Sequence, residues 1–201
     1  MLDRYAIAAF RPVLDRIGRL MVRAGIAADA VTWAGFAIGL AAAWAITQRL
    51  HGWALALLLA SRLADGLDGT VARLTTPTDR GAYLDIALDF IFYASIPLAF
   101  AMADPPANAL PAAVLLAAFV GTGSGFLAFA VMAERRQLSS TAYPAKGLYY
   151  LGGLTEATET LACFALMCLW PAQFALWAYG FAVLCGVTIV TRLAAGWTML
   201  G

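Results

Sequence analysis

The chain has 201 residues, of which 63% are hydrophobic and only 12% are charged, and its mean hydropathy is +0.80. An apolar share this far above that of ordinary soluble domains excludes a water-soluble globule. The formal net charge of +1, together with the long apolar runs, excludes a continuous basic face for nucleic acid.

The first 25 residues predict a helix that lies along a membrane surface. Between Leu2 and Met21, apolar residues recur at helical spacing, and most of the charged residues occupy the other side. Charged residues also interrupt this segment throughout, so it lacks the compact apolar region of a signal peptide. We therefore expect residues 1–25 to form an amphipathic helix in the membrane interface.

Six apolar runs follow, and each is long enough to cross a bilayer core of about 30 Å, which requires about 20 helical residues. They cover approximately residues 30–47, 53–72, 82–103, 109–133, 151–170 and 173–195. The short connections leave no room for a second, soluble domain. We expect one all-α integral membrane domain over residues 1–201, in which residues 29–196 form a bundle of six transmembrane helices.

The basic residues predict the orientation of this bundle, because Lys and Arg near the ends of spans remain in the cytoplasm. Five arginines precede the first run, two lie between the second and third runs, and three basic residues lie between the fourth and fifth. The connections expected on the opposite side contain a single Lys or Arg residue, Arg49. Both termini are therefore expected to be cytoplasmic.

Four aspartates lie in the second and third runs, two in each. A carboxylate at the centre of a membrane helix costs about 2.5–3.5 kcal/mol on insertion scales, so these residues require a specific explanation. Asp65 and Asp68 are three residues apart, and Asp85 and Asp89 are four apart, so each pair shares one helix face. The short connection makes the two helices antiparallel neighbours. We expect all four carboxylates to converge at the cytoplasmic side.

Neighbouring carboxylates repel one another unless cations join them. Mg²⁺ and Mn²⁺ prefer oxygen ligands of this kind, and two ions could be shared among the four aspartates. Such a centre is typical of enzymes that act on phosphate groups. Two other interpretations stay open: the aspartates form ion pairs with Arg62, Arg73 and Arg80, or they relay protons in a transporter.

Small residues accompany the aspartates, namely Gly66, Gly69 and Ala72 in the second run and Gly81 before the third. They predict a bare helix surface that a large ligand can approach closely. Arg73 offers a planar guanidinium for phosphate oxygens.

Together these residues follow the pattern DxxDGxxAR, then seven residues, then a glycine and two aspartates at four-residue intervals. The pattern resembles the signature of the CDP-alcohol phosphatidyltransferase family, in which many members have a spacer of eight. The matching positions are Asp65, Asp68, Gly69, Ala72, Arg73, Gly81, Asp85 and Asp89. Six spans after an interfacial helix also resemble that family, and the chain is most similar to its bacterial inner-membrane members.

The resemblance implies transfer of a phosphatidyl group from CDP-diacylglycerol to a small alcohol, with release of CMP. Asp65, Asp68, Asp85 and Asp89 would bind Mg²⁺ or Mn²⁺, and Asp89 would also be the catalytic general base. The positions implied to bind the CDP-lipid are Asp29, Thr32, Gly69, Ala72, Arg73, Thr78 and Gly81. Ala28 replaces the proline that usually precedes the element containing Asp29 and Thr32.

The resemblance places the alcohol acceptor among the fourth to sixth spans. Candidate residues there are Arg135, Lys146, Glu156, Glu159 and Arg192. The basic residues could serve an acceptor phosphate, or they could only be positive charges retained in the cytoplasm. The glutamates favour a hydroxyl-rich or cationic acceptor, or they pair with a basic residue to position a helix.

The family resemblance further implies a homodimer among the membrane lipids of a bacterial inner membrane, with the active site open to the cytoplasm. An alternative within the family transfers a small head group from CDP-ethanolamine or CDP-choline to diacylglycerol. A transporter and a catalytically silent member with a structural role are the remaining classes.

Overall fold

The computed structural model describes residues 3–136 and 153–201, with residues 3–10 described by their backbone alone. The described residues form helices and no strand. In chain order the elements are α1 (Asp3–Arg23), α2 (Ala28–Thr47), α3 (His51–Leu74), α4 (Asp79–Ala103), α5 (Pro105–Arg135), α6 (Ala157–Leu169), the 3₁₀ turn η1 (Pro171–Gln173) and α7 (Phe174–Leu200).

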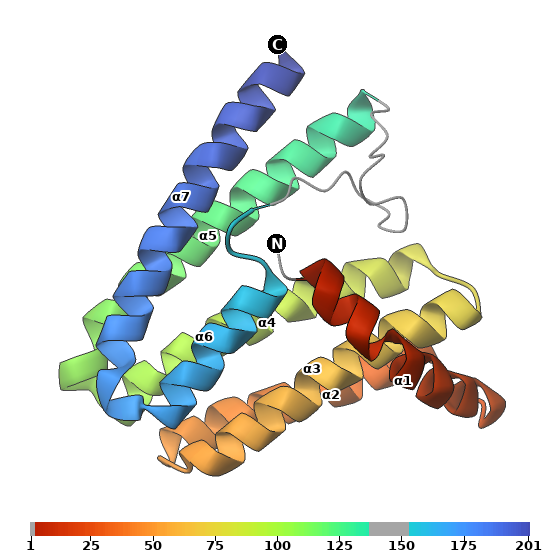
Figure 1. The fold of residues 1–201 in the computed structure, drawn as a ribbon, viewed down its shortest axis with the longest axis horizontal. Coiled ribbons are helices and arrows are strands. Elements are labelled where there is room, and N and C mark those ends of the chain that lie inside the picture. The colour runs from red at the N-terminus through yellow and green to blue at the C-terminus, as the bar shows by residue number, and fades with distance from the viewer. Residues whose placement is uncertain (1–2, 137–152) are drawn as a thin grey trace.

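Helix α4 links two halves of the described bundle (Figure 1). On one side it packs against α2, which pairs with α3, and α1 lies across α3. On the other side it packs against α5, which runs beside α7 (Figure 1). Helix α6 contacts α3 and α7, so it closes the space between the halves.

Four of the described helical segments are long and apolar enough to cross a membrane by length and composition: Ala28–Thr47, Asp79–Ala103, Pro105–Arg135 and Pro171–Leu200. Helix α3 has 24 residues, but charged side chains interrupt its second half. Helix α6 has 13 residues. The apolar runs thus predicted the positions of these helices, and α1 continues as a helix through Pro12.

The fifth run was expected to be helical from residue 151, but α6 begins only at Ala157. Residues 153–156 are not helical, and 154 and 155 form a bend. Thr155 in this bend donates hydrogen bonds to Thr188 Oγ1 of α7 from its backbone N–H at 3.1 Å and from its hydroxyl at 2.9 Å. These bonds tie the segment before α6 to α7, which accounts for the late start of the helix.

Aromatic side chains form the core where the helices meet. Phe92 of α4 packs edge-on against Phe164 of α6, with ring centroids 6.4 Å apart. Phe100 of α4 stacks on Phe174 at the start of α7, at 4.7 Å. All four rings are almost completely buried. Helix α4 supplies one ring of each pair. Packing against α6 and α7 therefore fixes the rotation of α4 about its axis and its position along that axis.

Glycines allow α2 to approach its neighbours closely. A Cβ atom on Gly39 would lie 2.6 Å from Phe92 Cδ2 of α4 and 2.9 Å from Ser61 Oγ of α3. A Cβ on Gly35 would lie 2.9 Å from the Cβ of Ala64 in α3. Ser61 also donates a 2.8 Å hydrogen bond to the Gly35 carbonyl oxygen. The spacing of α2, α3 and α4 therefore depends on these small residues.

The substitution Gly39→Ala is expected to destabilise the protein by about 1–3 kcal/mol, because the added methyl group overpacks a rigid core. Thermal unfolding in detergent micelles should show a lower midpoint. Gly186→Ala is the matched control, because a Cβ at Gly186 of α7 meets nothing within 4 Å. Equal midpoints for the two variants would contradict the close packing of α2.

Candidate active site

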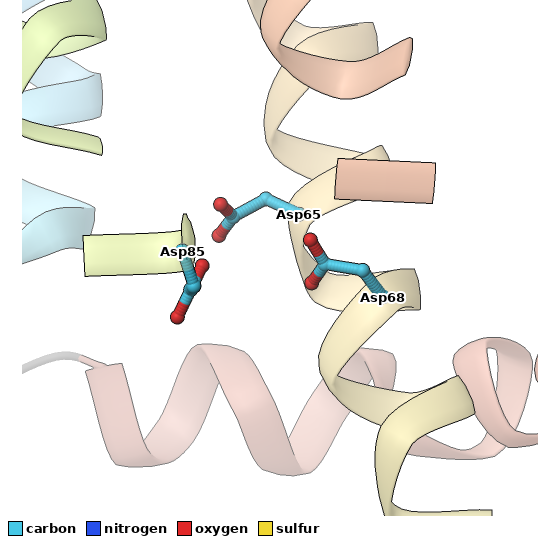
Figure 2. A group of neighbouring side chains, drawn as sticks. All are labelled: Asp65, Asp68 and Asp85. Atoms are coloured by element: carbon cyan, nitrogen blue, oxygen red, sulfur yellow. The ribbon is translucent and has the colours of Figure 1, made fainter. Parts of the chain in front are cut away.

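Three aspartates of α3 and α4 bring their carboxylates together. One oxygen from each of Asp65, Asp68 and Asp85 lies within 4.8 Å of the other two. Asp65 and Asp68 project from α3 toward Asp85 on α4 (Figure 2). Asp68 is buried, Asp65 is half-buried and Asp85 is exposed. The group therefore extends from the buried interior of the helix bundle to the protein surface.

This three-aspartate group fits a hard divalent cation. All of its donors are carboxylate oxygens, which Mg²⁺ and Mn²⁺ prefer. Asp68 Oδ2 is buried and has no hydrogen-bond partner, which is unfavourable for a charged oxygen outside water. A cation held by Asp65, Asp68 and Asp85 would satisfy that oxygen and offset the repulsion among the three side chains.

Asp89 lines the same cavity as the three-aspartate group, but its carboxylate is held by an arginine. Its Oδ1 accepts a 2.7 Å hydrogen bond from Arg62 Nη1, and the same nitrogen lies 3.3 Å from Asp65 Oδ1. Four convergent carboxylates were expected. Within the described residues, three have oxygens that meet, and the fourth, Asp89, faces Arg62.

Arg62 is a site residue whose functional role the sequence pattern does not indicate. Its side chain is only 12% exposed, and its guanidinium carbon lies 3.9 Å from the centroid of the Phe92 ring. From the sequence alone, it is a candidate only for structural ion pairs with the aspartates. The available signal was an arginine inside an apolar run, three residues before Asp65, since a lone charge there requires a nearby countercharge.

Three of the residues expected to bind the CDP-lipid lie together where α4 begins. Thr78 caps α4, because its Oγ1 accepts a 3.1 Å hydrogen bond from the Gly81 backbone N–H. Asp29 at the start of α2 forms an ion pair with Arg80. A Cβ on Gly81 would lie 3.3 Å from Asp29 Oδ1. These contacts join the N-terminal ends of α2 and α4 beside the three-aspartate group.

The remaining residues expected to bind the CDP-lipid lie on α3 and α2. Arg73 is exposed, and its Nη2 donates a 2.9 Å hydrogen bond to Thr70 Oγ1. Its Nη1 would lie 3.3 Å from a Cβ on Gly69, so the guanidinium occupies the space that this glycine leaves. Ala72 lies on the same helix, and Thr32 of α2 lines the cavity.

Gly66 has a different role from the one expected. The sequence predicted that it leaves α3 bare for a ligand, but a Cβ on Gly66 would lie 3.3 Å from Leu14 Cδ1 of α1. A Cβ on Gly18 of α1 would in turn lie 2.8 Å from Thr70 Cγ2. The two glycines therefore let α1 pack closely on α3.

Glu156 and Glu159 of the expected acceptor pocket cap the N-terminus of α6. The Glu156 side chain accepts from the Glu159 backbone N–H, and Glu159 Oε2 accepts a 3.2 Å hydrogen bond from the Glu156 backbone N–H. Glu156 Oε1 also accepts a 3.1 Å bond from the Gly153 N–H. This reciprocal arrangement satisfies backbone donors that a helix start leaves open. The glutamates thus position α6 by capping its backbone, whereas the alternative drawn from the sequence is pairing with a basic residue.

Arg192 of α7 lies in a cavity of about 470 Å³ between α5 and α7, whose walls are mainly apolar. Its Nη1 donates a 3.3 Å hydrogen bond to the Thr122 carbonyl oxygen of α5. Its Nη2 would lie 3.1 Å from a Cβ on Gly153, whose backbone N–H donates to Glu156 Oε1. Arg135 is exposed at the end of α5, and Lys146 lies outside the described residues.

Over most of its length, the chain is similar to one known protein family and to a protein of Escherichia coli. The model of the family described as CDP-alcohol phosphatidyltransferase matches residues 25–192. An inner membrane protein of Escherichia coli, YnjF, is 46% identical over 200 residues, which cover 100% of this chain and 97% of that protein.

Solved structures of a Mycobacterium tuberculosis enzyme have a similar fold. The structure of its phosphatidylinositol phosphate synthase with CDP-DAG bound has a TM-score of 0.72 and 24% identity, covering 93% of this chain and 94% of that chain. The structure of the same synthase in complex with manganese and citrate has a TM-score of 0.69 and 24% identity, covering 92% and 89%.

The substitution Asp68→Asn is expected to weaken Mn²⁺ binding by about tenfold or more. Replacing an anionic ligand with a neutral amide removes attraction worth at least about 1.4 kcal/mol. Calorimetric titration of the purified protein in micelles measures this affinity. Asp79→Asn is the matched control, since Asp79 is exposed in the first turn of α4. Wild-type affinity in the Asp68 variant would be incompatible with a metal site at the three-aspartate group.

The substitution Glu159→Ala is expected to lower the stability by about 1 kcal/mol, because the Glu156 backbone N–H loses its acceptor. Glu159→Gln retains an acceptor oxygen and should keep the wild-type midpoint of thermal unfolding. If Glu159→Gln lost as much stability as Glu159→Ala, the charge of this residue, rather than the capping hydrogen bond, would be its stabilising feature.

Proposed function

The chain belongs to the CDP-alcohol phosphatidyltransferase family, and from this premise we propose that it transfers the phosphatidyl group of CDP-diacylglycerol to a small alcohol and releases CMP. One observation carries the proposal. The three-aspartate group combines carboxylates from two helices, and a fourth carboxylate, Asp89, lines the same cavity. Such a site suits a divalent cation, a diphosphate and a base for the attacking hydroxyl.

Asp65, Asp68 and Asp85 would hold the ion, and Mg²⁺ or Mn²⁺ bound there would offset the negative charge of the donor's diphosphate and of the CMP that leaves. Arg73 is exposed beside Gly69, where its guanidinium binds phosphate oxygens of the donor. The N-terminal ends of α2 and α4, with Asp29, Thr32, Thr78 and Gly81, provide the surface for the cytidine portion.

Asp89 accepts the proton of the acceptor hydroxyl. The hydroxyl oxygen forms a bond to the phosphorus that carries diacylglycerol, and the bond from this phosphorus to the bridging oxygen breaks. CMP leaves with that oxygen. Arg62 holds Oδ1 of Asp89 at 2.7 Å. This contact fixes the orientation of the carboxylate, so that its other oxygen is positioned to accept the proton.

Two relatives support this reaction. The Mycobacterium tuberculosis synthase, which shares the fold, was crystallised with CDP-DAG and, separately, with manganese and citrate. The Escherichia coli relative is an inner membrane protein. By analogy, CDP-DAG is the donor here, a divalent ion is required, and the protein lies in the inner membrane of a bacterium.

The membrane arrangement is part of the proposal. Helices α3 and α6 cross the bilayer with the four apolar segments, giving six spans, and α1 lies in the cytoplasmic interface. Helix α1 packs on the half of α3 that contains Asp65 and Asp68, which supports an active site at the cytoplasmic side. The termini are cytoplasmic, as the basic residues predict, and the family resemblance supports a homodimer.

The acceptor binds near α5–α7, where Arg192 lines the cavity. Among the described residues that line this cavity, Arg192 carries the charged side chain, and the two glutamates cap α6 instead. This favours an acceptor that carries a phosphate, with neutral alcohols and amino alcohols as the contrasting group in the experiment.

The purified protein in micelles with Mg²⁺ or Mn²⁺ and CDP-diacylglycerol should release CMP when the correct alcohol is added. The panel is glycerol 3-phosphate, inositol, inositol phosphate, serine, glycerol, ethanolamine and phosphatidylglycerol. Asp89→Asn should lower kcat by about 10²–10⁴-fold, because the amide cannot accept the proton.

The matched control is Asp104→Asn, since Asp104 caps α5 at the far end of α4 and asparagine also serves as a cap. Undiminished activity in the Asp89 variant would remove it from the mechanism. If no acceptor yields CMP, CDP-ethanolamine and CDP-choline with diacylglycerol are tested next. Release only from those donors would replace the proposed donor with the alternative.

A further inference from the structure

Arg62 lies between two acidic residues that come from different helices. Its Nη1 is 2.7 Å from Asp89 Oδ1 on α4 and 3.3 Å from Asp65 Oδ1 on its own helix α3. The guanidinium also lies over the Phe92 ring, with its central carbon 3.9 Å from the ring centroid. One side chain thus has an electrostatic contact with both helices of the site.

The position of the guanidinium is fixed by packing. Its side chain is 12% exposed, and Phe92 beneath it is fully buried. The planar guanidinium stacks on an aromatic ring and bonds a carboxylate with a defined geometry, which an ammonium group does not reproduce. Arg62 therefore keeps its charge at one place in the cavity.

This fixed charge changes the requirement for metal ions. When ionised, the four aspartates carry four negative charges, and Arg62 offsets one of them. A divalent ion on the three-aspartate group offsets two more. A second divalent ion at Asp89 would either displace the 2.7 Å ion pair or bind the other carboxylate oxygen beside the guanidinium, which would repel it.

We propose that Arg62 is the resident cation of this centre: it positions Asp89 and leaves the three-aspartate group to bind a single divalent ion before substrate arrives. Arg62 is a positioning residue, because it acts through Asp89. The inference rests on the proposed function only in treating the three-aspartate group as the enzyme's metal site. It differs from the pair of ions that the four carboxylates alone suggested.

The number of bound ions tests this inference directly. Mn²⁺ is added to the full chain in micelles without nucleotide or lipid donor, and the bound fraction is measured by electron paramagnetic resonance. We expect one Mn²⁺ per chain. Two ions per chain with affinities within tenfold of each other would overturn the proposal.

Variants at Arg62 separate its charge from its shape. Arg62→Gln removes the charge and should bind two Mn²⁺ per chain, with a larger rise in the unfolding temperature on Mn²⁺ addition than the wild type shows. Arg62→Lys retains the charge and should bind one. If Arg62→Gln folds only with Mn²⁺ present, its ions are counted after purification in Mn²⁺. A count of one in Arg62→Gln, or of two in Arg62→Lys, would overturn the proposal.

Arg49→Gln is the matched control, because Arg49 is exposed before α3 and donates to the Ala103 carbonyl oxygen at the far end of α4. Its ion count should equal that of the wild type. The count does not depend on catalysis. A wild-type protein that binds one Mn²⁺ but releases no CMP would refute the proposed function and leave the role of Arg62 intact.

Discussion

The site depends on the need to balance carboxylate charge inside a bundle of apolar helices. Water is the usual partner of an ionised aspartate, and helices that pack against one another and against lipid exclude it. Here the balance has a fixed component, because Arg62 contacts Asp65 and Asp89. It also has an open component, because Asp68 Oδ2 is buried without a hydrogen-bond partner. The chain therefore balances one part of the cluster itself, and a bound cation would balance the other.

Such a charge arrangement requires that the helices cannot rotate, and the small residues of α2 provide this constraint. Gly35 and Gly39 bring α2 within contact of α3 and α4, while Phe92 packs against both Gly39 and the Arg62 guanidinium. One aromatic ring thus supports the helix spacing and the arginine. Changes in the packing of α2 are transmitted to the carboxylates through this ring, although α2 contributes none of them.

Much of this arrangement could be predicted from the sequence, because membrane thickness sets the length of apolar runs and helical periodicity places Asp65 and Asp68 on one face. The pairing of Asp89 with Arg62 could not be predicted, since it depends on the rotation of α4 relative to α3. The late start of α6 could not be predicted from the sequence either. It arises from hydrogen bonds between Thr155 and Thr188, which are 33 residues apart.

Helix α4 connects the two halves of the bundle, because it packs against α2 on one side and α5 on the other. Phe90 follows Asp89 directly, and its ring fills the space left by Gly123 of α5, where a Cβ would lie 2.3 Å from Phe90 Cε1. The neighbouring Thr122 carbonyl accepts the hydrogen bond from Arg192. Arg192 is therefore linked to Asp89 by a chain of contacts: Arg192 binds Thr122, the adjacent Gly123 contacts Phe90, and Phe90 adjoins Asp89. A larger residue at position 123 would therefore displace Phe90 and, with it, the segment of α4 that carries Asp89.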